Sequence, residues 1–208
     1  MNRQQFWVLV EEAREQVLDT RDASGIACRT SELLAGRSSP EITAAEQILW
    51  DLMADSYRNP LWAAAYVLNG GCSDDGFDYF RGWLIAQGRT VFERAVADPD
   101  TLAVLPDVRA AAPEGVFDCE EMLSIAWNAH QKATGQELPA DVFTIRYPGL
   151  DPAWDFDFDD REEMARRLPA LTALYSYSQQ AATSRVPDRA RPELPHRNRP
   201  QVLSGRPP

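Results

Sequence analysis

Residues 61–84 read LWAAAYVLNGGCSDDGFDYFRGWL, in which a double glycine separates an apolar run from an acidic and aromatic one. Residues 61–68 are apolar on nearly every side, which is typical of a helix at the centre of a fold rather than on its surface. Gly70 and Gly71 provide the tight turn that ends such a helix, and Ser73 is a good N-cap for the next one. Two consecutive helices are therefore predicted, the first of them buried.

Helix-start signals recur along the rest of the chain, as a capping side chain before a proline or as the spacing of a capping box. They are Ser39-Pro40, Asn59-Pro60, Asp98-Pro99, Thr90 with Glu93, and Asp118 with Glu121. Apolar residues at helical spacing, from Phe6 to Val17, mark one face of a first helix. Signals for strands occur only at residues 142–147 and in the Asp/Phe alternation at 155–159. The sequence predicts an all-α or predominantly α fold, a compact single-domain helical bundle with a buried central helix.

Composition divides the chain into a globular part, predicted as residues 1–177, and a Pro- and Arg-rich part, predicted as a flexible tail over 178–208. Residues 185–208 hold six arginines and two acids, a net charge of +4, so the net charge of −11 for the whole chain leaves −15 on the rest. An acidic body repels phosphates and anionic membranes and attracts cationic ligands and basic proteins. Nucleic acid is therefore not the predicted partner of the body.

The sequence also predicts where the protein resides. No run approaches the ~18 apolar residues of a membrane span, and the first residues lack the apolar core of a secretion signal. The cysteines Cys28, Cys72 and Cys119 form no Cys-x-x-Cys pair, which fits a reducing compartment. We expect a soluble cytoplasmic protein without a membrane partner.

The second helix of the opening stretch carries a candidate binding site of six residues. They are Asp74, Asp75, Asp78, Tyr79, Arg81 and Trp83. The first two acids lie at the helix N-terminus, where the helix dipole stabilises negative charge. Arg81 lies one turn after Asp78, close enough for an ion pair. Tyr79 and Trp83, four residues apart, share another face, and an aromatic pair beside acids suits a cationic or planar ligand.

The same residues also fit a purely structural role. The acids then cap the helix, Arg81 neutralises them, and the aromatic rings belong to the core. This interpretation leaves Gly76 and Gly82 unexplained. Each glycine inside a helix costs about 1 kcal/mol against alanine, which usually indicates the close approach of a backbone or a ligand.

Other chemistries find less support in the sequence. The three acids of the second helix suit Mg²⁺, but the positive end of the helix dipole opposes a bound cation. Residues 155–159 begin like a calcium loop, which then lacks its glycine and its final glutamate. A nucleophilic Cys72 or Ser73 would need His130 beside it as a base. Glycine motifs for nucleotides do not occur, so neither a metal nor a cofactor is predicted.

Several segments together resemble a known family. They are Phe6-Trp7, Leu61 to Tyr66, Gly70 to Gly88, Asp98 to Asp100 with Leu102, and Pro169 with Leu171. In these segments the chain resembles a bacterial family, domain-of-unknown-function 4240, which is common in actinobacteria. The resemblance extends to residue 176 and excludes the tail. It implies a shared fold and the place of a site, but it implies no activity.

Two functional hypotheses follow. The first is a binding or interaction module that recognises a small polar or cationic ligand, or a basic protein, through residues 70–89. The alternative is an enzyme of unassigned reaction, with Asp75 or Asp78 as general acid or base and Arg81 as the orienting group. The module is favoured because no nucleophile or proton-transfer pair is identifiable. We expect Asp78→Ala and Arg81→Ala to abolish binding while leaving folding largely intact.

Overall fold

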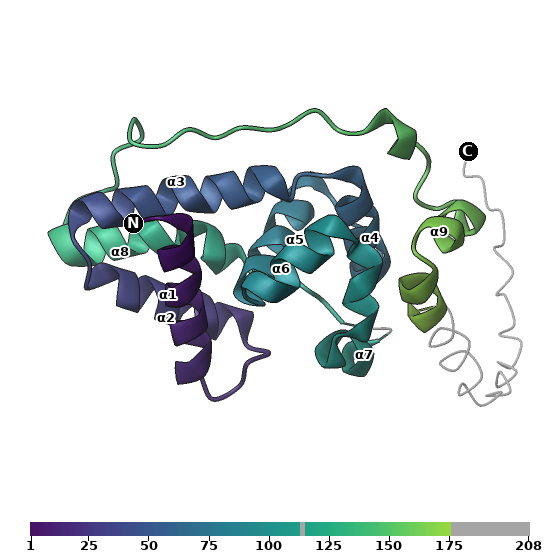
Figure 1. The fold of residues 1–208 in the computed structure, drawn as a ribbon, viewed down its shortest axis with the longest axis horizontal. Helices are drawn as coiled ribbons and strands as arrows, with labels where there is room; N and C mark the ends of the chain where they lie inside the picture. Colours follow the sequence, from purple (N-terminus) through teal and green to yellow (C-terminus); the bar gives the residue numbers. More distant parts are fainter. Residues whose placement is uncertain (113–114, 176–208) are drawn as a thin grey trace, which may run out of the picture.

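The computed structural model describes residues 1–112 and 115–175 (Figure 1). The predicted tail over 178–208, and the predicted domain end at 177, lie outside these residues. The described part is built from helices and contains no strand, which confirms the predicted all-α class. Within it, no helix combines the length and the apolar character that crossing a bilayer requires.

The helices fall into three groups along the long axis of the molecule (Figure 1). The α-helices are α1 (Arg3–Gln16), α2 (Ala23–Ala35), α3 (Ser39–Asp55), α4 (Asn59–Asn69), α5 (Asp74–Ala86), α6 (Arg89–Ala97), α7 (Pro106–Ala111), α8 (Ile125–Thr134) and α9 (Arg161–Arg167). The 3₁₀ helices are η1 (Pro99–Val104), η2 (Glu120–Ser124) and η3 (Pro152–Trp154), and a last helical run covers 169–175. At one end α1, α2, α3 and α8 pack together, α5 and α6 lie in the middle, and α4, α7 and α9 lie at the other end.

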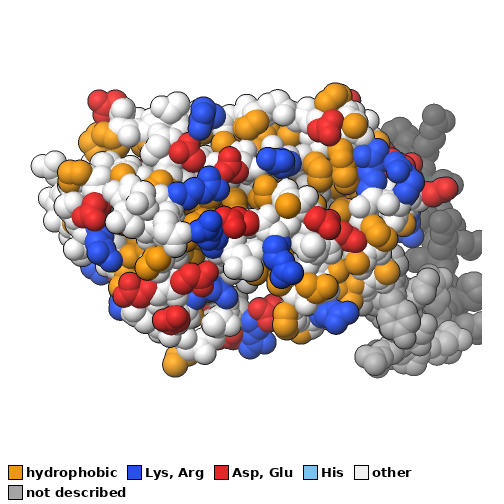
Figure 2. Space-filling view, in the orientation of Figure 1, with side chains coloured by type: hydrophobic (Ala, Val, Ile, Leu, Met, Phe, Trp, Pro, Cys, Tyr) orange, Lys and Arg blue, Asp and Glu red, His pale blue; other side chains and the backbone are white. Residues whose placement is uncertain are grey.

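On the face in Figure 2, acidic and basic side chains are interspersed, so the excess of acids forms no single patch there.

Most helix boundaries follow the predicted local chemistry. Gly70 ends α4 with a φ of 65°, in the left-handed region that favours glycine. Ser73 caps α5 and Asp98 caps η1, each through a hydrogen bond from the first turn, as predicted. Ser39 and Asn59 were predicted as caps, but they are the first residues of α3 and α4, because Ser38 and Arg58 occupy the N-cap positions.

The two remaining capping-box predictions, at Thr90 and Asp118, are wrong. Both α6 and η2 begin without a side-chain cap. In α6 a distant residue replaces the local one, since the carboxylate of Glu11 in α1 accepts a hydrogen bond from the Arg89 N–H at 3.2 Å. Tertiary packing thus satisfies a helix end that local sequence was expected to satisfy.

The predicted strands at 142–147 and 155–159 are also wrong. Residues 136–151, here called the strap, run without regular secondary structure along α3 from one end of the molecule to the other (Figure 1). The side-chain amide of Gln47 donates to the Thr144 carbonyl at 3.2 Å and accepts from the Thr144 N–H at 2.8 Å. The Gln47 side chain therefore makes both of the hydrogen bonds that a neighbouring strand would make to this peptide group in a sheet.

The core is deepest at α5. Phe77 and all of residues 80–86 are buried. The predicted central helix α4 buries Leu61, 63–65 and Leu68, while its other face is only partly covered. Burial is therefore more continuous in the helix after the double glycine than in the helix before it, and α5 lies in the middle of the fold (Figure 1).

Candidate functional site

The N-terminal acids of α5 lie at the surface. Asp74 and Asp75 are in the first turn and exposed, and their carboxylates form no hydrogen bond or ion pair with other residues that the structure describes. Tyr79 is half-buried, and its carbonyl accepts a hydrogen bond from the Cys119 N–H at 2.9 Å. The nearby Glu120 carboxylate is the main cause that raises the pKa of Tyr79 above its ordinary value. The first half of α5 thus exposes its acids to solvent, and its backbone binds the residue that precedes η2.

Arg81, by contrast, belongs to the core, with an exposed fraction of 1%. Its Nη2 is paired with the Asp78 carboxylate, and its Nη1 donates to the Met53 carbonyl in α3. The guanidinium carbon also lies 4.7 Å from the ring centre of Phe77 and 5.1 Å from that of Tyr57. Burial lowers the pKa of Arg81, and the neighbouring Asp78 charge opposes that change. Protein groups surround this guanidinium, so a ligand has no access to it.

The two glycines inside α5 have structural explanations. A Cβ on Gly82 would lie 2.3 Å from the Cys119 carbonyl oxygen, so the glycine lets η2 approach α5 closely. The Gly76 N–H donates to the capping Ser73 Oγ at 3.1 Å, and a Cβ there would lie 3.2 Å from that oxygen. The groups that approach these two glycines closely are thus the backbone of Cys119 and the capping side chain of Ser73, rather than a ligand.

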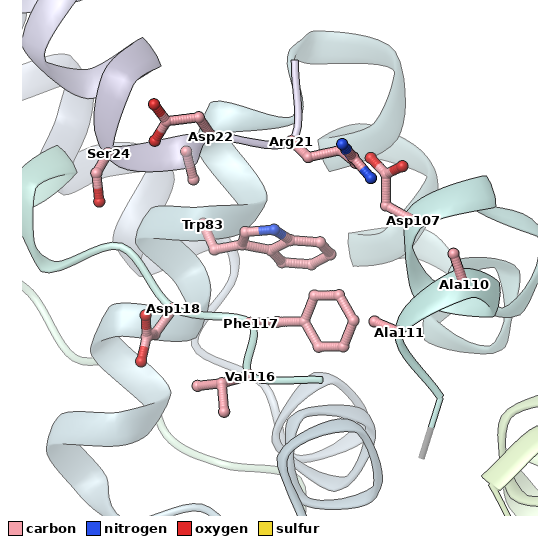
Figure 3. Close-up of a pocket in the computed structure, with 11 residues that line it drawn as sticks. Arg21, Asp22, Ser24, Trp83, Asp107, Ala110, Ala111, Val116, Phe117 and Asp118 are labelled. Atoms are coloured by element: carbon pink, nitrogen blue, oxygen red, sulfur yellow. The ribbon is translucent and has the colours of Figure 1, made fainter. Parts of the chain in front are cut away.

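Trp83 faces away from Arg81, because two residues along an α-helix are about 200° apart around its axis. It faces a cavity of about 410 Å³, here called the Trp83 pocket (Figure 3). The walls come from residues 21–24, from α7 and from residues 116–118. The ring of Phe117 stands edge-on to the indole, with ring centres 4.9 Å apart. Together these two rings form an aromatic surface inside the pocket.

Acids surround this aromatic surface. Asp22, Asp107 and Asp118 line the pocket, and Arg21 is the one cation among the described lining residues. The Asp19 carboxylate accepts hydrogen bonds from Nε and Nη2 of Arg21 at 2.9 and 2.8 Å. This pairing lowers the pKa of Asp19 to about 2. Because Asp19 compensates Arg21, the three lining carboxylates leave the pocket negative.

The indole N–H of Trp83 has no hydrogen-bond acceptor among the described residues, although the side chain is only 5% exposed. Figure 3 shows its nitrogen on the edge of the ring that faces Arg21 and Asp22. Two other tryptophans use this group within the protein. Trp50 donates to Glu46 at 2.9 Å, and Trp62 donates to the Cys72 carbonyl at 3.2 Å. The Trp83 N–H therefore remains available to an acceptor inside the pocket.

The six predicted site residues do not converge on one place. Asp78 and Arg81 form the predicted ion pair, but Trp83 opens into a cavity on another face, and the first-turn acids are at the surface. Sequence patterns did not identify the other polar and aromatic side chains that line the pocket. These are Arg21, Asp22, Ser24, Asp107, Phe117 and Asp118. No local spacing marks them, because packing of distant segments creates the pocket.

Nucleophilic and metal chemistry gain no geometric support. Burial raises the pKa of the Cys72 thiol to about 11 and that of Cys119 to about 12, which keeps both protonated near neutrality. The Nδ1 atom of His130 lies 3.0 Å from the Gln136 carbonyl oxygen, at the end of its own helix. In the part of the chain that the structure describes, no three Asp, Glu, His or Cys side chains converge as metal ligands.

Comparison with known proteins gives one match. The family model described as a protein of unknown function, DUF4240, matches residues 1–132, which include every residue that lines the Trp83 pocket. No curated protein matches the chain, and no solved structure matches it. The family predicted from the sequence is thereby confirmed over residues 1–132, while its actinobacterial source stays a prediction.

Proposed function

Since the chain belongs to the DUF4240 family, whose description names no activity, we propose from its structure that it is a binding module. Its Trp83 pocket recognises a polar, positively charged ligand. The observation that carries the proposal is the indole of Trp83, which forms a wall of a cavity also lined by three carboxylates and whose N–H has no acceptor among the described residues.

The chemistry of the pocket suits a guanidinium or ammonium group. A cation over the face of a tryptophan gains about 0.5–1 kcal/mol at exposed sites and about 2 when desolvated. Asp107 and Asp118 add charge-assisted hydrogen bonds to such a group, and Asp22 adds one through Oδ2, because its Oδ1 accepts the capping hydrogen bond from the Gly25 N–H at 2.8 Å. The indole N–H needs an acceptor on the same ligand, and a peptide that contains arginine provides both a cation and carbonyl oxygens. A cavity of about 410 Å³ is within the usual size of small-molecule sites.

The Trp83 pocket does not include the acids of α5 that the sequence predicted as binding residues. Asp74 and Asp75 are exposed carboxylates, suited to contact a basic protein at a second point. The alternative of an enzyme that uses Asp75 or Asp78 with Arg81 would need a movement of α5, because the guanidinium is 1% exposed. The predicted cytoplasmic location also stays a prediction.

The test uses the full chain and N-acetylarginine methylamide, whose Kd is measured by calorimetry and by shifts of the tryptophan indole N–H signals in NMR. Trp83→Phe identifies the Trp83 signal. N-acetylcitrulline methylamide, which has the same shape without the charge, is the matched control ligand. We expect Asp118→Asn to weaken binding about fivefold, since one partly exposed charge pair contributes about 1 kcal/mol.

Asp74→Asn removes an exposed acid of α5 outside the pocket, and we expect it to leave the Kd unchanged. If Asp74→Asn weakens binding and Asp118→Asn does not, the ligand binds at the start of α5 and the pocket assignment fails. Equal affinity for the citrulline compound would show that charge is not recognised.

A further inference from the structure

The C-terminal segment of the same chain offers a ligand of the required chemistry. We infer that an arginine of residues 176–208 occupies the Trp83 pocket in the resting protein and competes with external ligands. The inference rests on the proposed function, because it assigns a regulator to the same pocket. The segment lies outside the described residues. Three features support its assignment: the chemistry of the pocket, the sequence of the segment and the point where the described chain ends.

Charge and residue type agree with this assignment. Residues 176–208 contain six arginines, no lysine and two acids, a net charge of +4. The planar guanidinium stacks on aromatic rings and pairs with carboxylates through two parallel hydrogen bonds, whereas lysine offers a compact point charge. The pocket provides both kinds of partner, an aromatic surface at Trp83 and three carboxylates.

The backbone of the segment suits the unpaired indole N–H. Arg191, Arg199 and Arg206 each precede a proline, a sequence context that disfavours helix. A carbonyl oxygen is also the kind of acceptor that the N–H of Trp83 needs. An arginine followed by proline thus offers the cation and the acceptor within one residue.

The described chain ends beside η1, the element that precedes one wall of the pocket. Asp100 of η1 accepts hydrogen bonds from the Ala170 and Leu171 N–H groups at 2.9 Å each, which fixes the helical run 169–175 beside η1. The element after η1 is α7, and its Asp107 lines the pocket. Arg185 follows Tyr175 by ten residues, and an extended chain of that length spans roughly 33 Å. Tethering also gives the segment an effective concentration on the order of millimolar.

The test compares the full wild-type chain with a full-length tail-neutral variant. That variant carries R185Q, R189Q, R191Q, R197Q, R199Q and R206Q. Two quantities are measured for each protein: the Kd of N-acetylarginine methylamide and the indole N–H signal of Trp83. We expect the Kd to fall about threefold or more in the variant, because a tethered competitor has been removed. We also expect the indole signal to move in the absence of any added ligand.

A matched control separates occupation of the pocket from a general effect of charge. In the Asp118→Asn background, the tail substitutions should change the Kd by a smaller factor than they do when Asp118 is present. A lower Kd with an unmoved indole signal would mean that the tail acts only through net charge, and the inference fails.

The remaining outcomes distinguish this inference from the proposed function. If both proteins bind the probe equally and their indole signals coincide, the tail does not occupy the pocket, while the binding function stands. If neither protein binds the probe but the indole signal moves on tail neutralisation, the tail contact stands and recognition of external ligands fails. No binding and no movement would overturn both.

Discussion

Arg81 is a buried cation whose position is fixed from three directions. It is paired with Asp78 on its own helix, it donates to the Met53 carbonyl of α3, and it lies over the rings of Phe77 and Tyr57. Removing one member of such a group leaves buried polar atoms without partners and a cavity beside them. The residue that the sequence suggested as a ligand contact therefore has a structural role in this geometry.

We expect Arg81→Ala to lower the free energy of unfolding by about 3 kcal/mol, through the lost hydrogen bonds and the cavity. This differs from the expectation from sequence that folding stays largely intact. Arg94→Ala, which removes an exposed helical arginine, is the control and should change stability by less than about 0.5 kcal/mol. Urea denaturation measures both, and equal stabilities of the two variants would contradict the structural role.

Glu46 makes stability depend on pH in an unusual direction. It is 4% exposed, its Oε1 accepts from Trp50, and its Oε2 has no hydrogen-bond partner among the described residues. Burial raises the pKa of Glu46 above that of the unfolded chain. The stability due to the protonated form is complete below the unfolded pKa and is lost as pH rises through the folded pKa.

Glu46→Gln keeps an acceptor for the Trp50 N–H and cannot ionise. We expect wild type to lose more stability than Glu46→Gln between pH 4 and pH 8, by about 1.4 kcal/mol for each unit of pKa elevation. Thermal unfolding of both proteins across this range measures the difference. Parallel pH profiles would show that Glu46 is hydrated or paired in solution.

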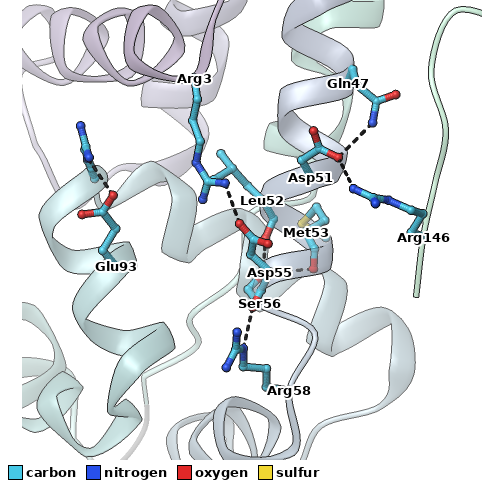
Figure 4. Close-up of polar contacts among 11 residues, drawn as sticks. Arg3, Gln47, Asp51, Leu52, Met53, Asp55, Ser56, Arg58, Glu93 and Arg146 are labelled. Carbon is cyan, nitrogen blue, oxygen red and sulfur yellow. Dashed lines mark hydrogen bonds and ion pairs between the residues drawn. The ribbon is translucent and has the colours of Figure 1, made fainter. Parts of the chain in front are cut away.

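At the scale of elements, one face of α3 holds the strap. Gln47, Trp50 and Asp51 share this face at helical spacing, and Asp51 pairs with Arg146 at 2.8 Å (Figure 4). Trp50 stacks on Phe143, with ring centres 6.4 Å apart and planes inclined by 6°. The strap is thus fixed by side chains of one helix rather than by a ladder of backbone hydrogen bonds.

We expect Gln47→Ala to loosen the middle of the strap, because the Thr144 peptide loses both its donor and its acceptor partner. The cost is about 1 to 2 kcal/mol for two hydrogen bonds. Hydrogen exchange of the Thr144 amide should become faster, while Gln131→Ala, at an exposed position on α8, should leave it unchanged. Unchanged exchange in Gln47→Ala would mean that the ring stack alone holds the strap.

For the whole molecule, we expect the protection of backbone amides against hydrogen exchange to decrease from α5 toward the strap. Residues 80–86 are buried, whereas Ile145 and Tyr147 of the strap are exposed by 43% and 59%. Amides that open only on global unfolding exchange slowest, and those of weakly packed segments open locally. In native-state hydrogen exchange we expect the slowest amides in α5. Slower exchange in α3 or α8 would place the most stable part at the other end of the molecule.

Local chemistry was sufficient to predict the helical class and several boundaries. Proline, glycine and capping side chains act on their immediate neighbours, so Gly70 and Ser73 determine where α4 ends and α5 begins. The same reasoning predicted the ion pair of Asp78 and Arg81, three residues apart on one helix. The predicted strand at 142–147 was wrong because alternation shows that a segment is extended, not that another strand lies beside it.

The sequence by itself determined which residues of α5 share a face, because the helical repeat is set by backbone geometry. It put Arg81 and Trp83 on opposite sides of the helix. Only the tertiary structure decided that the Arg81 side is closed by α3, while the Trp83 side opens into a cavity walled by α7 and the start of α2. That outcome depends on how residues far apart in the chain, such as Asp22 and Trp83, come to line one cavity, and such packing leaves no local pattern.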